Sequence, residues 1–420
     1  MTKNQAIDYL HYLMLGAVSI FIILAPYEHK YLGKITFAVG LIFLFVMKIL
    51  QHRRSFFHNI FIARDLINPF FVFGLACVLS IIFSSDAYHS QAVFFDRYIL
   101  YLFYFLIGIW VSTGFQGKIK LFVFALFVSS LIYGIGGAWD FIKCNKESYD
   151  RLWTVFGRTI PFYGFPLYLV YFIPFVSFLS FKNIFVRIMR YINQLLLIAC
   201  LVWCASRASW VAITVSLLLL FSIKFRKAKK RVLALLFVLV TLIISANFSP
   251  LNMKERILTI AYPEKWSFRI PLFKSALKIF RDNPVFGTGL GTFETVIRSP
   301  EYELPADYPI TKKLNLHAHN TYLEILAEMG IVGLFSFLSI FAVFFWRAFK
   351  KIVSPEKDVS WNEQAVFIGL TASVLSALIF AFSTTFIIVG VNNSAYFWLL
   401  FGAAAGMLPN SRTLSEKSIP

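Results

Sequence analysis

Long apolar stretches divide this chain, and their length constrains its fold more than any other feature. An α-helix needs about 20 mainly apolar residues to cross the hydrocarbon core of a bilayer. Twelve stretches approach that length, so the sequence predicts an all-α, polytopic integral membrane protein with about 12 transmembrane helices. The predicted spans are 7–26, 33–50, 67–84, 97–112, 120–142, 161–181, 190–206, 208–224, 232–248, 325–346, 363–390 and 394–409.

Composition excludes the main alternatives. Of the 420 residues 59% are hydrophobic and 15% are charged, whereas an average soluble domain is about 25% charged. This excludes a soluble globular enzyme, a disordered chain, a disulfide scaffold and a collagen-like fibre. We expect one membrane-embedded domain over residues 1–420, in which the long polar stretch 249–324 separates the ninth and tenth spans.

The positive charge is explained first by topology. The chain carries 40 Lys and Arg and a formal net charge of +19. With the N-terminus inside, 22 of them fall on the inner side, while the short outer loops hold only 8. This is the asymmetry of the positive-inside rule, so no nucleic-acid partner is needed. An even number of spans places both termini in the cytoplasm and makes 249–324 an outer, periplasmic segment.

The remaining ten basic residues lie in that outer segment, within 249–320. Outer loops are normally poor in Lys and Arg. We therefore expect an anionic partner at the outer face, either a substrate or the headgroups of membrane lipids alone.

The most specific motif joins this segment to the tenth span. It contains His317, His319 and Asn320, followed by Thr321 and Glu324. Thr321 and Glu324 have the spacing of a capping box, which predicts a helix start there. The histidines then lie just before a helix N-terminus at the membrane boundary, where free backbone N–H groups favour an anion. A histidine there can accept a proton near neutral pH, or it can simply hydrogen-bond a loop.

Two glycines follow inside the expected helix. Gly330 and Gly333 lie on one helical face and predict the close approach of a neighbouring helix. His319-Asn320, nine residues, then Gly330-x-x-Gly333 resembles the signature of the bacterial O-antigen ligase family, part of the O-antigen ligase and polymerase superfamily. The twelve spans, cytoplasmic ends and long outer segment are also similar to that family.

Two arginines match further elements of the family. Arg207 lies in Ser206-Arg207-x-x-Trp210, at the outer junction of the seventh and eighth spans, where an unpaired charge is costly. It could be a snorkelling residue that anchors the turn, but the resemblance implies contact with a lipid-linked diphosphate. Arg269 precedes an expected helix that ends at Pro284, and the resemblance assigns it to phosphate binding.

The helix after Arg269 has an amphipathic pattern. One face is apolar, the other is basic, and this predicts a helix lying on the outer leaflet. The apolar face is Ile270, Phe273, Leu277 and Phe280, and the basic face is Lys274, Lys278 and Arg281. Two other arginines are possible site-lining residues: Arg97, beside Asp96 at the start of the fourth span, and Arg158 before the sixth.

The resemblance implies an inverting, metal-independent glycosyltransferase of the bacterial inner membrane, active on its periplasmic face. It would transfer a glycan from undecaprenyl diphosphate to the lipid A core in lipopolysaccharide biosynthesis. His319 would be the catalytic residue, and no cofactor is expected.

Three alternatives remain. An O-antigen polymerase or a protein O-oligosaccharyltransferase would use the same donor. A polysaccharide transporter would favour similar halves and charges near the bilayer midplane, whereas the charges here gather at the outer ends of the spans.

Overall fold

The computed structural model describes most of the chain and confirms an all-α, multi-pass membrane protein. It describes residues 3–27, 34–40, 42, 64–113, 116–143, 154–155, 158–159, 164–224, 269–302, 304, 308, 316–353, 361–389 and 391–408. Within these residues, five helices are long and apolar enough to cross a membrane, and four shorter apolar helices accompany them.

The helices follow the predicted spans closely. Ten of the twelve predicted spans contain a described helix, the second span is described only at 34–40 and 42, and 232–248 lies outside the described residues. The first half contains α1 (Lys3–Leu24), η1 (Ala25–Tyr27), α4 (Arg64–Ile82), α5 (Ala87–Val93), the π-helix η2 (Phe94–Ile99), α6 (Leu100–Ser112) and α7 (Gln116–Lys143). The middle contains α8 (Gly164–Phe178), α9 (Ile184–Trp203) and α10 (Arg207–Lys224).

The outer segment and the last spans complete the fold. They contain α13 (Arg269–Asp282), α14 (Phe293–Val296), η4 (Pro300–Tyr302), α15 (Thr321–Val353), α16 (Trp361–Phe380) and α17 (Val391–Gly406). Among the described residues the β-structure is one antiparallel pair of two-residue strands, β1 (Thr154–Val155) and β2 (Arg158–Thr159).

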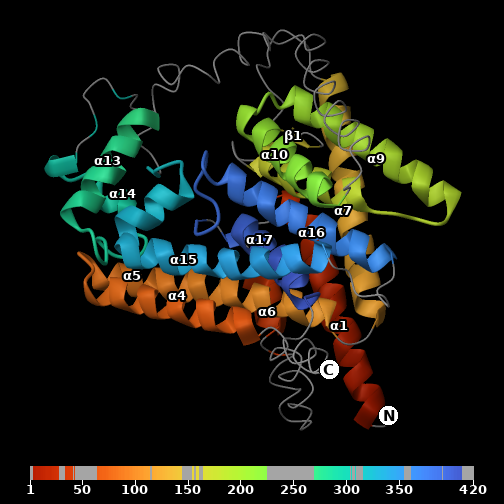
Figure 1. Cartoon of the computed structure of the whole chain (residues 1–420), viewed down its shortest axis with the longest axis horizontal. Coiled ribbons are helices and arrows are strands. Elements are labelled where there is room, and N and C mark those ends of the chain that lie inside the picture. Colours follow the sequence, from red (N-terminus) through yellow and green to blue (C-terminus); the bar gives the residue numbers. More distant parts are fainter. Residues whose placement is uncertain are drawn as a thin grey trace.

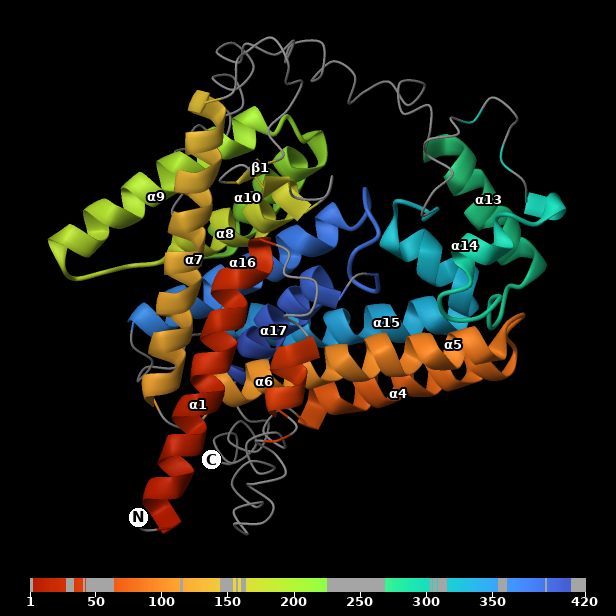
Figure 2. The ribbon, with the colours of Figure 1, turned by 180° about the vertical axis from the view of Figure 1, so that it is seen from behind.

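The helices pack in pairs that are distant in sequence. α4 lies along α15 and α6 along α17 (Figure 1), and α8 lies along α16 and α1 along α7 (Figure 2). α6 and α17 approach each other closely at Gly108 and Gly402, because a Cβ atom on either glycine would collide with the other helix's backbone. Small residues permit such contact in membrane bundles.

A second, smaller hydrophobic core lies outside the helix bundle. It joins α13 and α14 to the start of α15 through residues such as Leu272, Ile279, Phe293 and Ala327. Figure 2 shows α13 and α14 together at the end of the molecule where α15 begins, opposite the protruding α9. The sequence did not predict this second core, because single apolar residues scattered over a polar stretch do not indicate one.

Candidate active site

The N-terminus of α15 is fixed by Asn320. The Asn320 Oδ1 atom accepts hydrogen bonds from the backbone amides of Tyr322 (3.0 Å) and Leu323 (3.1 Å). This is the geometry of an N-cap. The predicted helix start is therefore correct, but Asn320 rather than Thr321 caps it. The Thr321 hydroxyl instead donates to the Thr384 carbonyl (2.9 Å), which ties the helix start to the segment after α16.

Glu324 serves the residues before the helix. Its Oε1 atom lies 2.9 Å from His317 Nδ1. Its Oε2 atom accepts hydrogen bonds from the Ala318 amide (2.7 Å) and the Thr385 hydroxyl (2.9 Å). The Glu324 side chain is only 1% exposed, so this buried carboxylate is compensated by three donors, as a buried charge requires.

The His317 imidazole is tuned by the charges around it. Burial lowers its pKa, but the charge and hydrogen bond of Glu324 and the charge of Glu328 raise it more, so the net pKa lies above the usual 6.5. Arg97 acts in the opposite direction. The side chain is 28% exposed, so this paired imidazole remains accessible at the protein surface.

His319 adopts an unusual backbone conformation. Its φ angle is 48°, in the left-handed region that non-glycine residues seldom occupy. The side chain is half-buried and interacts with its surroundings. His319 is thus one strained residue between Ala318, held by Glu324, and Asn320, which caps the helix.

A break in α15 lies three turns further on. Gly330 has φ 62° and ψ −163°, and it interrupts the helix. The released backbone groups bond to the segment after α13: the amides of Ile331 and Val332 donate to the carbonyls of Pro284 and Val285. The predicted packing role of Gly330 is therefore corrected, because a Cβ atom there would collide with Val285 of this segment rather than with a helix.

Gly333 also has a different surrounding from the one expected. A Cβ atom on Gly333 would meet the side chain of Met329, one turn earlier in the same helix. The close neighbour is created by the break at Gly330, which displaces the preceding turn. A sequence pattern based on regular helical spacing could not show this.

Glu328 is a buried acidic residue near the candidate site that the sequence analysis did not assign a role. It is 3% exposed, and its Oε1 atom accepts a hydrogen bond from the Phe293 amide (3.1 Å). Its carbonyl accepts from the Ser80 hydroxyl (2.9 Å). Glu328 therefore joins α4, α14 and α15 directly behind the His317–Glu324 pair.

Arg207 is the first residue of α10. The turn before it contains Ala205 with φ 50°. The Trp210 indole donates to the Leu201 carbonyl at the end of α9 (2.9 Å). The Ser-Arg-x-x-Trp element thus builds a tight α9–α10 corner that presents Arg207 at a helix N-terminus, where an anion is favoured.

Arg269 likewise begins α13 within the described residues. Besides the predicted apolar face, this helix has a second apolar side that the sequence analysis did not identify. The protein buries Leu272, Ala276 and Ile279, because the small outer core lies on that side. Leu277 stays 40% exposed, so the face predicted from 3–4–3 spacing points away from the core.

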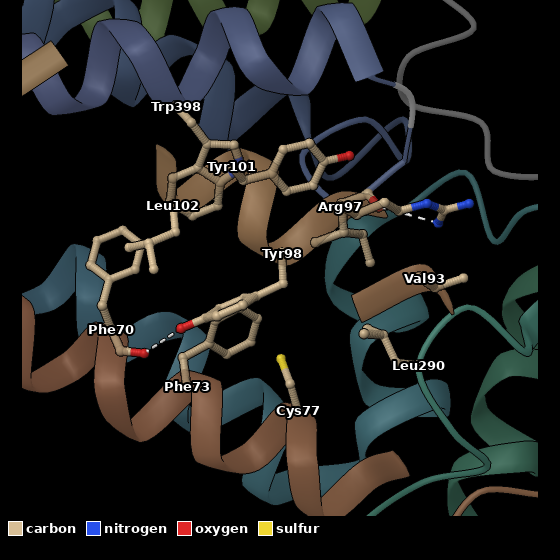
Figure 3. A pocket seen from close by; sticks show the side chains of 11 residues that line it. Phe70, Phe73, Cys77, Val93, Arg97, Tyr98, Tyr101, Leu102, Leu290 and Trp398 are labelled. Atoms are coloured by element: carbon tan, nitrogen blue, oxygen red, sulfur yellow. Dashed lines mark hydrogen bonds between the residues drawn. The ribbon is translucent and has the colours of Figure 1, made fainter. Parts of the chain in front are cut away.

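Arg97 lies at the end of an apolar pocket (Figure 3). Its Nη1 atom donates to the Ile388 carbonyl (3.3 Å). Figure 3 shows the guanidinium group directed away from the rings of Phe70, Phe73 and Tyr98. The pocket is small, with about 20 Å³ of space, which is room for about one water molecule. Asp96 is 3.6 Å from Lys34, at Oδ1 and Nζ.

The structure brings some predicted residues together and separates others into different elements. His317, Asn320 and His319 share one loop, and the charge of Arg97 acts on His317. α10 and α13, which begin with Arg207 and Arg269, both contact α15.

Arg158 pairs with Val155 through its backbone, and its side chain lies outside the described residues. Among the described residues, no three His, Cys, Asp or Glu side chains gather as a metal site requires.

Comparison with known proteins identifies this region. Residues 192–338 match the family described as O-antigen ligase. The teichuronic acid biosynthesis protein TuaE of Bacillus subtilis (strain 168) is 26% identical over 152 residues, which is 35% of this chain and 28% of that relative. The match thus spans little more than a quarter of the relative. The matched family region contains Arg207, Arg269, His319 and both motif glycines, and this chain therefore carries an O-antigen ligase family domain over residues 192–338.

Proposed function

We propose that this protein is an O-antigen ligase: an inverting glycosyltransferase that moves a glycan from undecaprenyl diphosphate to the lipid A core. The observation that carries the proposal is the loop 317–320, which presents His319 at the N-terminus of α15 within the family domain. A histidine in that position can accept a proton, and the adjoining helix end favours an anion.

The reaction exchanges one bond for another. The oxygen of an acceptor sugar hydroxyl attacks the anomeric carbon, and the bond from that carbon to the diphosphate oxygen breaks. The hydroxyl proton passes to His319, and the electron pair of the broken bond leaves with the diphosphate. Attack from the face opposite the leaving group inverts the anomeric centre.

Arg207 and Arg269 are the proposed diphosphate ligands. A guanidinium group binds phosphate oxygens through two parallel hydrogen bonds and keeps its charge at every working pH. It also stabilises the charge that develops as the diphosphate leaves, which favours the transition state over the ground state. Both arginines begin helices, α10 and α13, and both lie within the region that matches the family, which supports a shared role in donor binding.

Arg97 is the charged residue near the His319 loop that supports a donor with an anionic head. Its charge acts on His317, and it lies at the end of a small apolar pocket. We propose that Arg97 helps to hold the donor, with Asn320 and His317 in the site lining and no metal or cofactor involved.

The proposed location is the bacterial inner membrane, with both termini cytoplasmic and 249–324 periplasmic within one domain. A reporter fused after Arg231 should then read cytoplasmic, and one within 285–310 should read periplasmic. The opposite result would place the His319 loop on the cytoplasmic side, away from a periplasmic acceptor.

A second candidate is a polymerase of a different cell-surface polysaccharide. The similarity to TuaE favours a polysaccharide other than O-antigen, because that protein's name places it in teichuronic acid biosynthesis. A deletion strain distinguishes the two. Uncapped lipid A core together with carrier-linked polymer of normal length supports the ligase. Loss of polymer length on the carrier supports the polymerase, and glycan missing from protein supports an O-oligosaccharyltransferase.

A further inference from the structure

On its N-terminal side, the loop that presents His319 is held by the Glu324 side chain. Glu324 accepts hydrogen bonds from His317 and Ala318, the two residues directly before His319, and from Thr385 on the segment after α16. On the other side, Asn320 is committed to the helix cap. His319 therefore has fixed neighbours in both directions.

The hydrogen bonds on both sides of His319 offset the free-energy cost of its backbone conformation. A non-glycine residue in the left-handed region costs on the order of 1–3 kcal/mol, and His319 has φ 48°. Such a conformation persists only when surrounding contacts hold it in place. On the N-terminal side of His319, the described contacts that hold the backbone all involve the Glu324 carboxylate.

We propose that Glu324 and His317 form a positioning pair that holds His319 in its working orientation and sets the charge beside the donor. This proposal rests on the proposed function. It gives Glu324 and His317 a role in the transfer step, and Glu324 acts through its neighbours rather than by touching the substrate. The protonated His317 balances the negative charge of Glu324, whereas neutral His317 leaves that charge uncompensated next to an anionic donor.

The charged groups that face His317 come from two elements. Glu324 and Glu328 lie on α15 and favour the imidazolium form, and Arg97 lies on η2 and opposes it. Thr385, on the segment after α16, also contacts Glu324, but its hydroxyl does not titrate in this pH range. The net effect raises the pKa of His317 above 6.5, so transfer should decrease at alkaline pH as His317 loses its proton.

The test compares Glu324→Gln with Thr385→Val in purified protein and a lipid-linked glycan donor. Glu324→Gln keeps the shape but removes the charge. It should lower kcat by up to about 10²-fold, the cost of a misplaced reacting group, and largely remove the alkaline decrease in kcat/KM, because no Glu324 charge is then left uncompensated when His317 loses its proton. Thr385→Val removes one hydrogen bond and no charge, so kcat should fall a few-fold without a shift of that decrease. Thr384→Val, one residue earlier, is the matched control.

Hydrogen exchange gives a readout that does not depend on activity. The amides of residues 316–320 should exchange faster in Glu324→Gln and Thr385→Val than in Thr384→Val. Unchanged exchange, or an unchanged alkaline decrease in Glu324→Gln, would overturn the positioning pair. His319→Ala is measured in parallel: full transfer by that variant would refute the proposed function, while the exchange result would still decide the pair.

Discussion

The backbone amide of Gly289 donates a hydrogen bond of 2.9 Å to the carbonyl oxygen of Glu328. It joins the glycine-rich turn after α13 to the helix that carries the histidine motif. The neighbouring Thr288 amide bonds Ala327 in the same way (3.1 Å). The two segments therefore form one structural unit behind the His319 loop, and a change in either should affect both.

Gly330→Ala tests the break in α15. Its φ of 62° is strained for any residue with a side chain, and the new Cβ atom would collide with the Val285 backbone. We expect a loss of about 1–3 kcal/mol in the free energy of unfolding, the cost of such strain, visible as a lower Tm in detergent. Gly16→Ala is the control, because a Cβ atom there meets nothing within 4 Å. Equal Tm values for the two variants would contradict the strained break.

His319→Ala should remove most glycan transfer while the protein still inserts and folds. A general base contributes about 10²–10⁴-fold in rate, so a loss of that size is expected in transfer from purified lipid-linked donor. His317→Ala should have a smaller effect. His319→Gln separates two roles, because Gln can hydrogen-bond a hydroxyl but cannot take its proton. Full activity in His319→Gln would reduce His319 to a positioning group.

The arginines should act on the donor rather than on folding. Arg207→Lys keeps the charge but loses the planar fork, so transfer should be impaired. Arg269→Ala should raise the donor KM while the Tm changes little, because Arg269 lies half-buried at a helix start. The measurement is donor-dependent kinetics at equal protein levels. Wild-type kinetics in both variants would exclude a diphosphate clamp.

Arg97→Leu should weaken donor use if Arg97 helps to hold the anionic head of the donor. The substitution removes the cation at the pocket's end but keeps an apolar side chain there, so we expect a higher donor KM and a smaller change in kcat. Arg298→Ala serves as the control, since Arg298 pairs with Glu294 on an exposed surface, where ion pairs contribute little. The idea fails if both variants keep the wild-type KM.

The stability of the protein should depend on the protonation of His317. Its folded-state pKa is raised above 6.5, so the stabilisation is fully present below that value and is lost as pH rises through the raised pKa. The Tm should therefore decrease over this alkaline interval in the wild type. The decrease should be smaller in His317→Gln, which cannot titrate. Parallel Tm curves for both proteins would show that His317 does not contribute.

Much of the architecture follows from the sequence because membrane spans depend on local properties. Apolar length is a property of each segment alone, so ten predicted spans contain described helices. The start of α15 was predicted for the same reason, since a helix cap involves adjacent residues. The family motif could also be read directly, and the match over 192–338 confirms it.

Tertiary structure alone decided the rest, because those features join residues that are far apart in the chain. The break at Gly330 is possible only where residues 284–289 supply partners for its released backbone groups. The buried face of α13 depends on the outer core formed with α14 and α15, so the apolar spacing that predicted a side facing the leaflet could not reveal this second, core-facing side. Likewise, the sequence spacing of Glu324 suggested a helix cap, yet its carboxylate binds His317, Ala318 and Thr385. Helix periodicity specifies which residues share a face, but only the packed fold specifies what that face meets.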